Sequence, residues 1–185
     1  MRLLVITLAL GLFTSCTASV DSANVAPDWS LVSAQGETVQ LSREVREQPT
    51  VLLFWATWCP YCKALMPHLQ SMRLEYGGKI KILAINFREE GDPVEFIRRA
   101  GYDFTVLPDG DDVAASYAIY GTPGVVIVDS DRTIRFDLRS LPRREPPRSD
   151  KPAGHKRNAA YQAPYWAAEI RKSIDIVLGE STLFE

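Results

Sequence analysis

The stretch TVLLFWATWCPYCK, residues 50–63, decides the fold of this chain. It begins with an apolar run that does not alternate, which is typical of a strand buried on both faces. An amphipathic stretch with helical spacing follows, and a proline at position 60 suits a first helical turn because it loses no hydrogen bond there. A buried strand that leads into a helix therefore places Cys59 and Cys62 together on the first helical turn.

The two thiols, separated by two residues, suit reversible disulfide chemistry. The helix N-terminus stabilises a thiolate, so we expect Cys59, at this terminus and near the surface, to be the nucleophile with a pKa below the usual value of about 8.5. Cys62 lies a turn further in and is expected to be the resolving thiol, which attacks the mixed disulfide. We expect Pro60 and Tyr61 to tune the pair through turn geometry and amide hydrogen bonds to sulfur.

Three other uses of the two cysteines compete with disulfide exchange. A structural zinc site needs two further ligands, but there is no second Cys pair, and His68 and His155 are the only histidines. A purely structural disulfide that closes so short a loop stabilises a protein little. A catalytic cysteine of the peroxidase type would not need Cys62 at this spacing. We therefore expect a redox dithiol without a metal or a bound cofactor.

Length and charge narrow the class of protein. A chain of 185 residues favours one domain with a full core. The net charge of -2 and the pI near 5.8 give no indication of a nucleic-acid partner.

The N-terminus has the pattern of an export signal. Arg2 is followed by the apolar residues 3–13, which suit a signal-peptide core and are too short to span a bilayer comfortably. We therefore expect residues 1–16 to be a signal peptide, residues 17–26 a tether, and residues 27–185 the domain, in the periplasm or cell envelope.

Residues 13–16, FTSC, resemble a bacterial lipoprotein processing box, in which Cys16 would be lipidated and anchor the protein to the membrane. Phe13 departs from the usual Leu or Val of that box. The alternative is ordinary cleavage near Ala18, which discards Cys16. Either way Cys59 and Cys62 would be the only free thiols of an exported protein, which favours their pairing with each other.

The rest of the chain predicts further strands and helices. We expect a hairpin over residues 29–41, a second buried strand at 79–87, a short extended segment at 104–107 and an antiparallel hairpin over 125–138. Helices are predicted from Pro93 to Gly101, over 112–120 and over 165–178. Residues 141–164 are rich in proline, hold six Lys or Arg against two Asp or Glu, and lack an apolar period. We expect them to form an exposed basic loop, with docking of an acidic partner or of anionic lipid as the alternative.

The string WATWCPYCK at residues 55–63, together with Pro67 and with GTP at residues 121–123, resembles the thioredoxin superfamily. The expected N-terminal hairpin and export narrow the resemblance to the thiol–disulfide oxidoreductases of the TlpA/ResA type. It covers residues from about 27 to 138 and resumes in the last helix. It implies an α/β thioredoxin-like fold, with a central mixed sheet flanked by helices and an N-terminal β-hairpin extension. It also implies protein disulfide substrates and a membrane thiol electron donor.

The resemblance assigns further site residues. It implies that Thr122-Pro123 is a cis peptide beside the dithiol and that the backbone before this proline pairs with an extended substrate segment. Trp58, Tyr61 and Pro123 would then form an apolar rim for the partner, although Trp58 fits ordinary packing equally well.

Two positions depart from the superfamily pattern. Thioredoxins carry a buried acid where this chain has Leu53, and ResA-like proteins often carry a Glu where it has Leu65. Proton transfer must therefore use water or another group. Reductase activity is the leading prediction, and a dithiol oxidase or isomerase and a redox-switched binding module are the alternatives.

Overall fold

Strand β3 (Thr50–Trp55) lies at the centre of a five-stranded sheet in the order β5-β4-β3-β6-β7. It pairs in parallel with β4 (Lys81–Asn86), which pairs in parallel with β5 (Thr105–Leu107). On its other edge it pairs antiparallel with β6 (Gly124–Val128), which pairs antiparallel with β7 (Ile134–Asp137). This computed structural model describes residues 24–144, 146 and 154–181. The mixed sheet confirms the predicted fold class.

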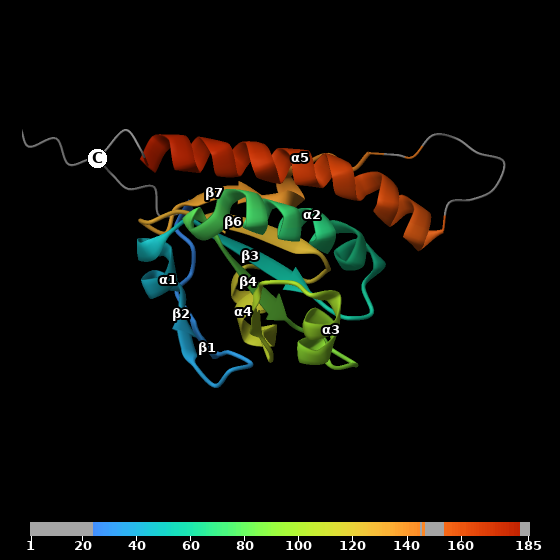
Figure 1. Cartoon of the computed structure of the whole chain (residues 1–185), viewed down its shortest axis with the longest axis horizontal. Helices are drawn as coiled ribbons and strands as arrows, with labels where there is room; N and C mark the ends of the chain where they lie inside the picture. Colours follow the sequence, from blue (N-terminus) through green and yellow to red (C-terminus); the bar gives the residue numbers. More distant parts are fainter. Residues whose placement is uncertain (1–23, 145, 147–153, 182–185) are drawn as a thin grey trace, which may run out of the picture.

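Helices cover both faces of the sheet (Figure 1). One face carries α2 (Pro60–Tyr76), α3 (Pro93–Ala100) and α5 (His155–Ser181), whose apolar side chains share a core with Val51, Leu53 and Trp55. The other face carries α1 (Leu41–Glu47) and α4 (Asp111–Ser116), which share a second core with Leu52 and Phe54. The alternation of β3 side chains between two cores explains its unbroken apolar sequence.

Short elements complete the fold. The hairpin of β1 (Ser30–Val32) and β2 (Thr38–Gln40) confirms the predicted N-terminal extension. Two 3-10 helices, η2 (Gly77–Lys79) and η3 (Leu138–Ser140), follow α2 and β7. Val25 bridges Thr133, and Ala26 is buried, so the folded part already includes the end of the predicted tether. The predicted signal peptide and Cys16 lie outside the described residues.

Helix α5 begins at His155, so the prediction of a loop as far as residue 164 was wrong in its second half. The buried positions of this first part are Ala159, Gln162 and Ala163, which have the spacing of a helix face. Because two of these side chains are small and one is polar, the sequence shows no apolar period there. Pro164 lies inside the helix and is exposed. Residues 145 and 147–153 of the predicted loop lie outside the description.

Within the described residues, none of the helices combines the length and the apolar character that crossing a membrane requires.

Candidate active site

Both cysteines of the Cys-x-x-Cys motif lie where β3 ends and α2 begins. Cys59 is the N-cap residue of α2, Pro60 occupies the first turn, and Cys62 lies within that turn. Both are free thiols. Cys59 is only 1% exposed, so the prediction that it lies near the surface was wrong. It belongs to the same apolar cluster as Trp55 and Trp166, and the side chains of this cluster cover it.

The environment of the two sulfurs makes them unequal. The backbone N–H of Cys62 donates a hydrogen bond to Cys59 Sγ over 3.1 Å. Hydrogen bonding from the Cys62 thiol, helped by the Thr122 hydroxyl and by backbone N–H groups, lowers the pKa of Cys59 to about 6. Burial, together with the adjacent Cys59, raises the pKa of Cys62 well above its ordinary value. At neutral pH the site therefore holds one thiolate, on Cys59, and one thiol.

The Thr122–Pro123 peptide bond is cis, as the resemblance implied. It lies in the turn that leads into β6, the strand next to β3. The Thr122 side chain forms hydrogen bonds that lower the pKa of both cysteines, so its hydroxyl lies within reach of both sulfurs.

A groove of about 350 Å³ begins at this proline. We call it the Pro123 groove, and its lining includes Tyr61, Thr122, Pro123, Leu141, Arg143 and Trp166. The groove brings two of the three predicted rim residues, Tyr61 and Pro123, together.

The third predicted rim residue, Trp58, does not line the Pro123 groove. It is 48% exposed, and its indole N–H donates to the carbonyl oxygen of Arg88 over 2.8 Å. Trp58 therefore combines an exposed ring with a fixed orientation.

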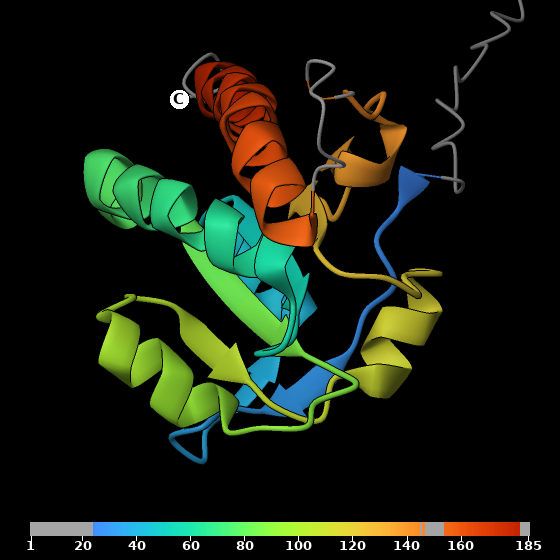
Figure 2. The ribbon, with the colours of Figure 1, turned by 90° about the vertical axis from the view of Figure 1, so that its right-hand side faces the viewer.

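The first turns of α5 lie beside the first turn of α2, at the end of the molecule that holds the dithiol (Figure 2). The ring centroid of Tyr61 lies 6.0 Å from that of Trp166 and 6.3 Å from that of His155. Both partners come from α5. The helix thus supports one wall of the Pro123 groove, a role that the sequence did not indicate because residues 155–164 were expected to be a loop.

Glu89 supports the residues that precede Cys59. Its carboxylate accepts hydrogen bonds from the Thr57 N–H (2.9 Å), the Thr57 hydroxyl (2.5 Å) and the Asn86 side chain (2.6 Å). It also accepts from the N–H groups of Glu90 and Gly91. Partial burial raises the pKa of Glu89, but the hydrogen bonds outweigh it and lower the pKa to about 2. The carboxylate therefore fixes the loop that delivers Cys59 to α2.

The role of Glu89 was not predicted from the sequence. The available signal was Asn86, a polar residue at the end of a buried apolar strand, whose side chain needs a partner.

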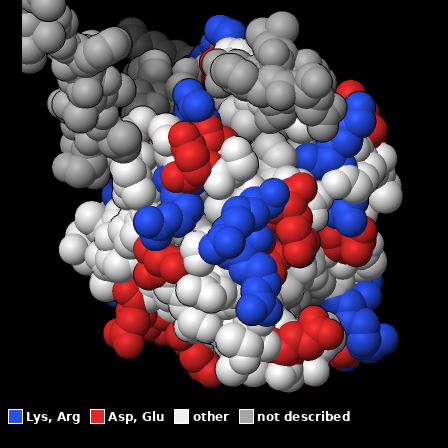
Figure 3. Space-filling model, turned by 90° about the vertical axis from the view of Figure 1, so that its left-hand side faces the viewer, with Lys and Arg blue, Asp and Glu red and all other residues white. Residues whose placement is uncertain are grey.

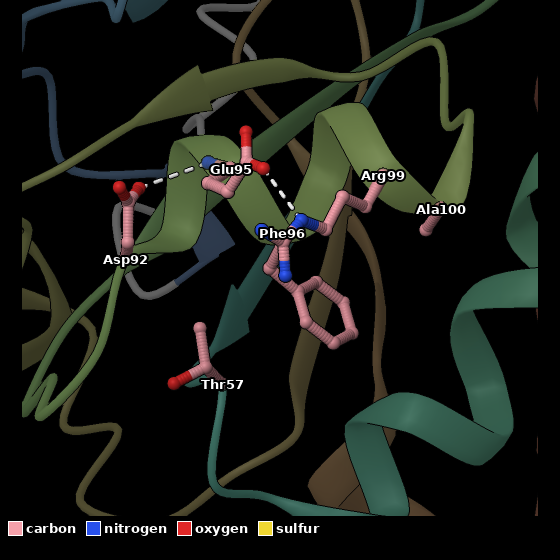
Figure 4. Close-up of a pocket in the computed structure, with 6 residues that line it drawn as sticks. All are labelled: Thr57, Asp92, Glu95, Phe96, Arg99 and Ala100. Atoms are coloured by element: carbon pink, nitrogen blue, oxygen red, sulfur yellow. Dashed lines mark hydrogen bonds and ion pairs between the residues drawn. The ribbon is translucent and has the colours of Figure 1, made fainter.

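A larger cavity, of about 530 Å³, lies between Thr57 and helix α3 (Figure 4). Its polar side chains mainly bind one another: Glu95 accepts from Arg98 and Arg99, and its N–H donates to Asp92. Phe96 forms its apolar wall and packs against Trp55. No group of three or more His, Cys, Asp or Glu side chains suitable for a metal ion occurs within the described ranges 24–144, 146 and 154–181.

The mixed sheet, the Cys-x-x-Cys pair at the start of α2 and the cis-proline beside it define a thioredoxin-like protein. Residues 23–137 match the AhpC/TSA family, and the chain belongs to it.

Several proteins that are similar to this chain have names that refer to thiol–disulfide exchange. The chain is 32% identical over 132 residues to the thiol-disulfide oxidoreductase ResA of Geobacillus kaustophilus, a match that covers 70% of this chain and 75% of that protein. It is 27% identical over 150 residues to the thiol:disulfide interchange protein DsbE of Allochromatium vinosum, covering 79% of this chain and 71% of that protein. A solved structure of an uncharacterized conserved protein from Geobacillus kaustophilus shares the fold. Its TM-score is 0.64 at 22% identity, over 84% of this chain and 81% of that one.

Proposed function

We propose that this protein is an exported thiol–disulfide oxidoreductase that reduces disulfide bonds of partner proteins through Cys59 and Cys62. The observation that carries the proposal is the pair of thiols on the first turn of α2, beside the cis-proline, with the Cys62 N–H donating to Cys59 Sγ over 3.1 Å. The lowered pKa of Cys59 and the raised pKa of Cys62 agree with it. A thiolate is needed to start the exchange. The second thiol must stay protonated until the mixed disulfide has formed, and must then attack it. The names of the ResA and DsbE relatives support the same chemistry.

In the first step the Cys59 thiolate attacks one sulfur of the substrate disulfide. A bond forms between Cys59 Sγ and that sulfur, the substrate S–S bond breaks, and the departing thiolate takes a proton from water. In the second step Cys62 gives its proton to water and attacks Cys59 Sγ. The bond between Cys59 Sγ and the substrate breaks, and the other substrate sulfur leaves as a thiolate that takes up a proton. The substrate gains two electrons, and the protein is left with a Cys59–Cys62 disulfide.

The second step requires Cys62 to ionise although Leu53 and Leu65 supply no acid or base. Burial, hydrogen bonding to Cys59 and the negative charge of Cys59 all raise the pKa of Cys62. In the mixed disulfide Cys59 carries no charge and no proton, so the contributions from Cys59 to this raised pKa fall away. Hydrogen bonds from the Ala56 backbone and the Thr122 side chain lower the pKa of Cys62, and these two groups can stabilise its thiolate.

The oxidised protein must be reduced again by an external dithiol, and the proposed donor is a membrane thiol carrier. The proposed location is the periplasm or cell envelope. The signal-peptide pattern of residues 1–16 supports export, and the processing box that ends at Cys16 supports a lipid anchor.

Reduction of insulin by the purified protein, with dithiothreitol as donor, tests the proposal. We expect turnover by the natural sequence and none by Cys59→Ser, because serine supplies no thiolate. Insulin binding that survives Cys59→Ser without any turnover of the natural sequence would instead favour a redox-switched binding module. Oxidation of a reduced peptide faster than reduction of insulin would favour a dithiol oxidase.

A further inference from the structure

The Pro123 groove combines an apolar floor with positive charge at its border. The two chain segments beside it, residues 138–144 and 154–166, contain no Asp or Glu. Their basic residues are Arg139, Arg143, Arg144, Lys156 and Arg157. The end of the molecule away from the dithiol has a different character, because basic and acidic side chains alternate over it (Figure 3). In the sequence, Asp137 and Glu145 flank residues 138–144, so the run without acidic residues is limited to the segment beside the groove.

The chain on the other side of Cys59 has the opposite charge. The loop between β4 and α3 holds three acids, Glu89, Glu90 and Asp92, against one base, Arg88. Glu89 holds Thr57 in place. A segment that crosses the dithiol would thus meet positive charge on the Pro123 side and negative charge on the other.

The arginines in and beside the groove differ in their interactions with neighbouring residues. Arg139 donates to both carboxylate oxygens of Asp137 and to the carbonyl oxygen of Ala118, so its charge is compensated. Arg144 lies over the ring of Tyr165, 3.7 Å from its centroid. Arg143 is exposed, and none of the residues that the structure describes forms a hydrogen bond or an ion pair with it. Among the described residues that line the groove, Arg143 is therefore the cation whose guanidinium can bind a ligand without breaking a bond that the structure shows.

We propose that the Pro123 groove selects substrate segments that carry an acidic side chain next to the disulfide cysteine, with Arg143 binding that carboxylate. This inference rests on the proposed function, since it names the kind of disulfide that Cys59 attacks. In an extended segment at Pro123 successive side chains point to opposite sides, so the residue next to the cysteine can face the groove while the cysteine faces Cys59. The apolar side chains of Tyr61, Leu141 and Trp166 accommodate its aliphatic part, and guanidinium binds carboxylate with two parallel hydrogen bonds.

The test uses three disulfide-bridged peptides that differ only in the residue next to one cysteine: Glu, Gln or Lys. We expect the purified reduced protein to reduce the Glu peptide about threefold to fivefold faster than the Lys peptide, the size of one exposed ion pair. Arg143→Glu should reverse this ratio, and a higher salt concentration should bring it towards one. The matched control is Arg43→Glu, the same charge change at an exposed position of α1 that does not line the groove, and it should leave the ratio unchanged.

The outcomes separate the inference from the function on which it rests. Equal rates for all three peptides would overturn acidic selection and leave the reductase proposal standing. Reduction of none of them would overturn both. Equal rates together with weaker co-sedimentation of Arg143→Glu on phosphatidylglycerol vesicles would assign the basic border to lipid and also overturn the inference. A ratio that changes equally in Arg43→Glu would show a general charge effect and contradict a role for Arg143.

Discussion

Two sulfur atoms with different protonation states give the site its direction of attack. The helix N-cap position and the surrounding donors stabilise the Cys59 thiolate, whereas burial and the neighbouring Cys59 raise the pKa of Cys62 and keep it protonated. The Cys62 thiol also donates to Cys59, so a change of protonation at either sulfur alters the pKa of the other. In the proposed exchange, this coupling would let one buried pair first hold a nucleophile and then generate a second one.

Alkylation of the reduced protein by iodoacetamide checks the assignment. Because the thiolate is the reactive form, we expect the rate at Cys59 to rise with pH and to reach half its maximum near pH 6. Cys62 should stay unmodified over this range. Mass spectrometry after proteolysis identifies the modified residue, and a midpoint between 8 and 9 at Cys59, about that of an ordinary thiol, would contradict the assignment.

Glu89 is expected to stabilise the fold. Glu89→Ala removes the acceptor of the Thr57 and Asn86 hydrogen bonds and should lower the free energy of unfolding by about 2 kcal/mol at pH 7. The folded-state pKa, about 2, lies below the ordinary 4.5, so this stabilisation is complete above pH 4.5 and is lost as the pH falls towards 2. Urea unfolding at several pH values measures it.

Glu90→Ala is the matched control for Glu89→Ala. Glu90 is the exposed neighbour in the same loop, and its removal should change the free energy of unfolding by less than about 0.5 kcal/mol. Equal effects of the two substitutions would contradict the special role of Glu89.

At the scale of elements, α5 connects the core to the site. Its C-terminal part contributes Ile170, Ile174 and Val177 to the core, while Trp166 contacts Tyr61 in the dithiol turn. Helix α5 therefore connects the core to one wall of the Pro123 groove through Trp166.

Substitution of Trp166 measures this contribution. Trp166 is 8% exposed, and Trp166→Ala should lower the free energy of unfolding by about 3–5 kcal/mol, the usual loss for a buried tryptophan. Tyr161→Ala, on the same helix but 40% exposed, should cost less than about 1 kcal/mol. Urea unfolding of both variants gives the comparison, and losses of similar size would show that α5 does not pack through Trp166.

Some helices and strands could be predicted from the sequence, and others could not. Strand β3 and helix α2 follow directly from the apolar run, Pro60 and the spacing of Leu65, Leu69 and Met72. The start of α5 was missed because its buried side chains are alanines and a glutamine, which leave no apolar pattern. The bonds of Glu89 were missed for a different reason, since they join positions that meet only in the folded loop.

At the scale of the whole molecule, the fold brings three distant parts of the chain to one place. The dithiol turn, the cis-proline turn and the start of α5 meet at the carboxyl end of β3 (Figure 2). The first two were predicted together because their motifs resemble one superfamily. The burial of Cys59 could not be predicted from the sequence, since it depends on the packing of a core cluster whose members come from distant parts of the chain.

Trapping of mixed disulfides with Cys62→Ala tests the central claim, that Cys59 exchanges disulfides with protein partners, most directly. Without the resolving thiol, the second step stops, and we expect partner proteins from cell-envelope extracts to remain bound to Cys59 through a disulfide that dithiothreitol releases. Cys59→Ala is the control and should capture none of them. Mass spectrometry of the linked peptides identifies the bonded cysteine. Capture of no partner by Cys62→Ala, or equal capture by Cys59→Ala, would contradict the claim.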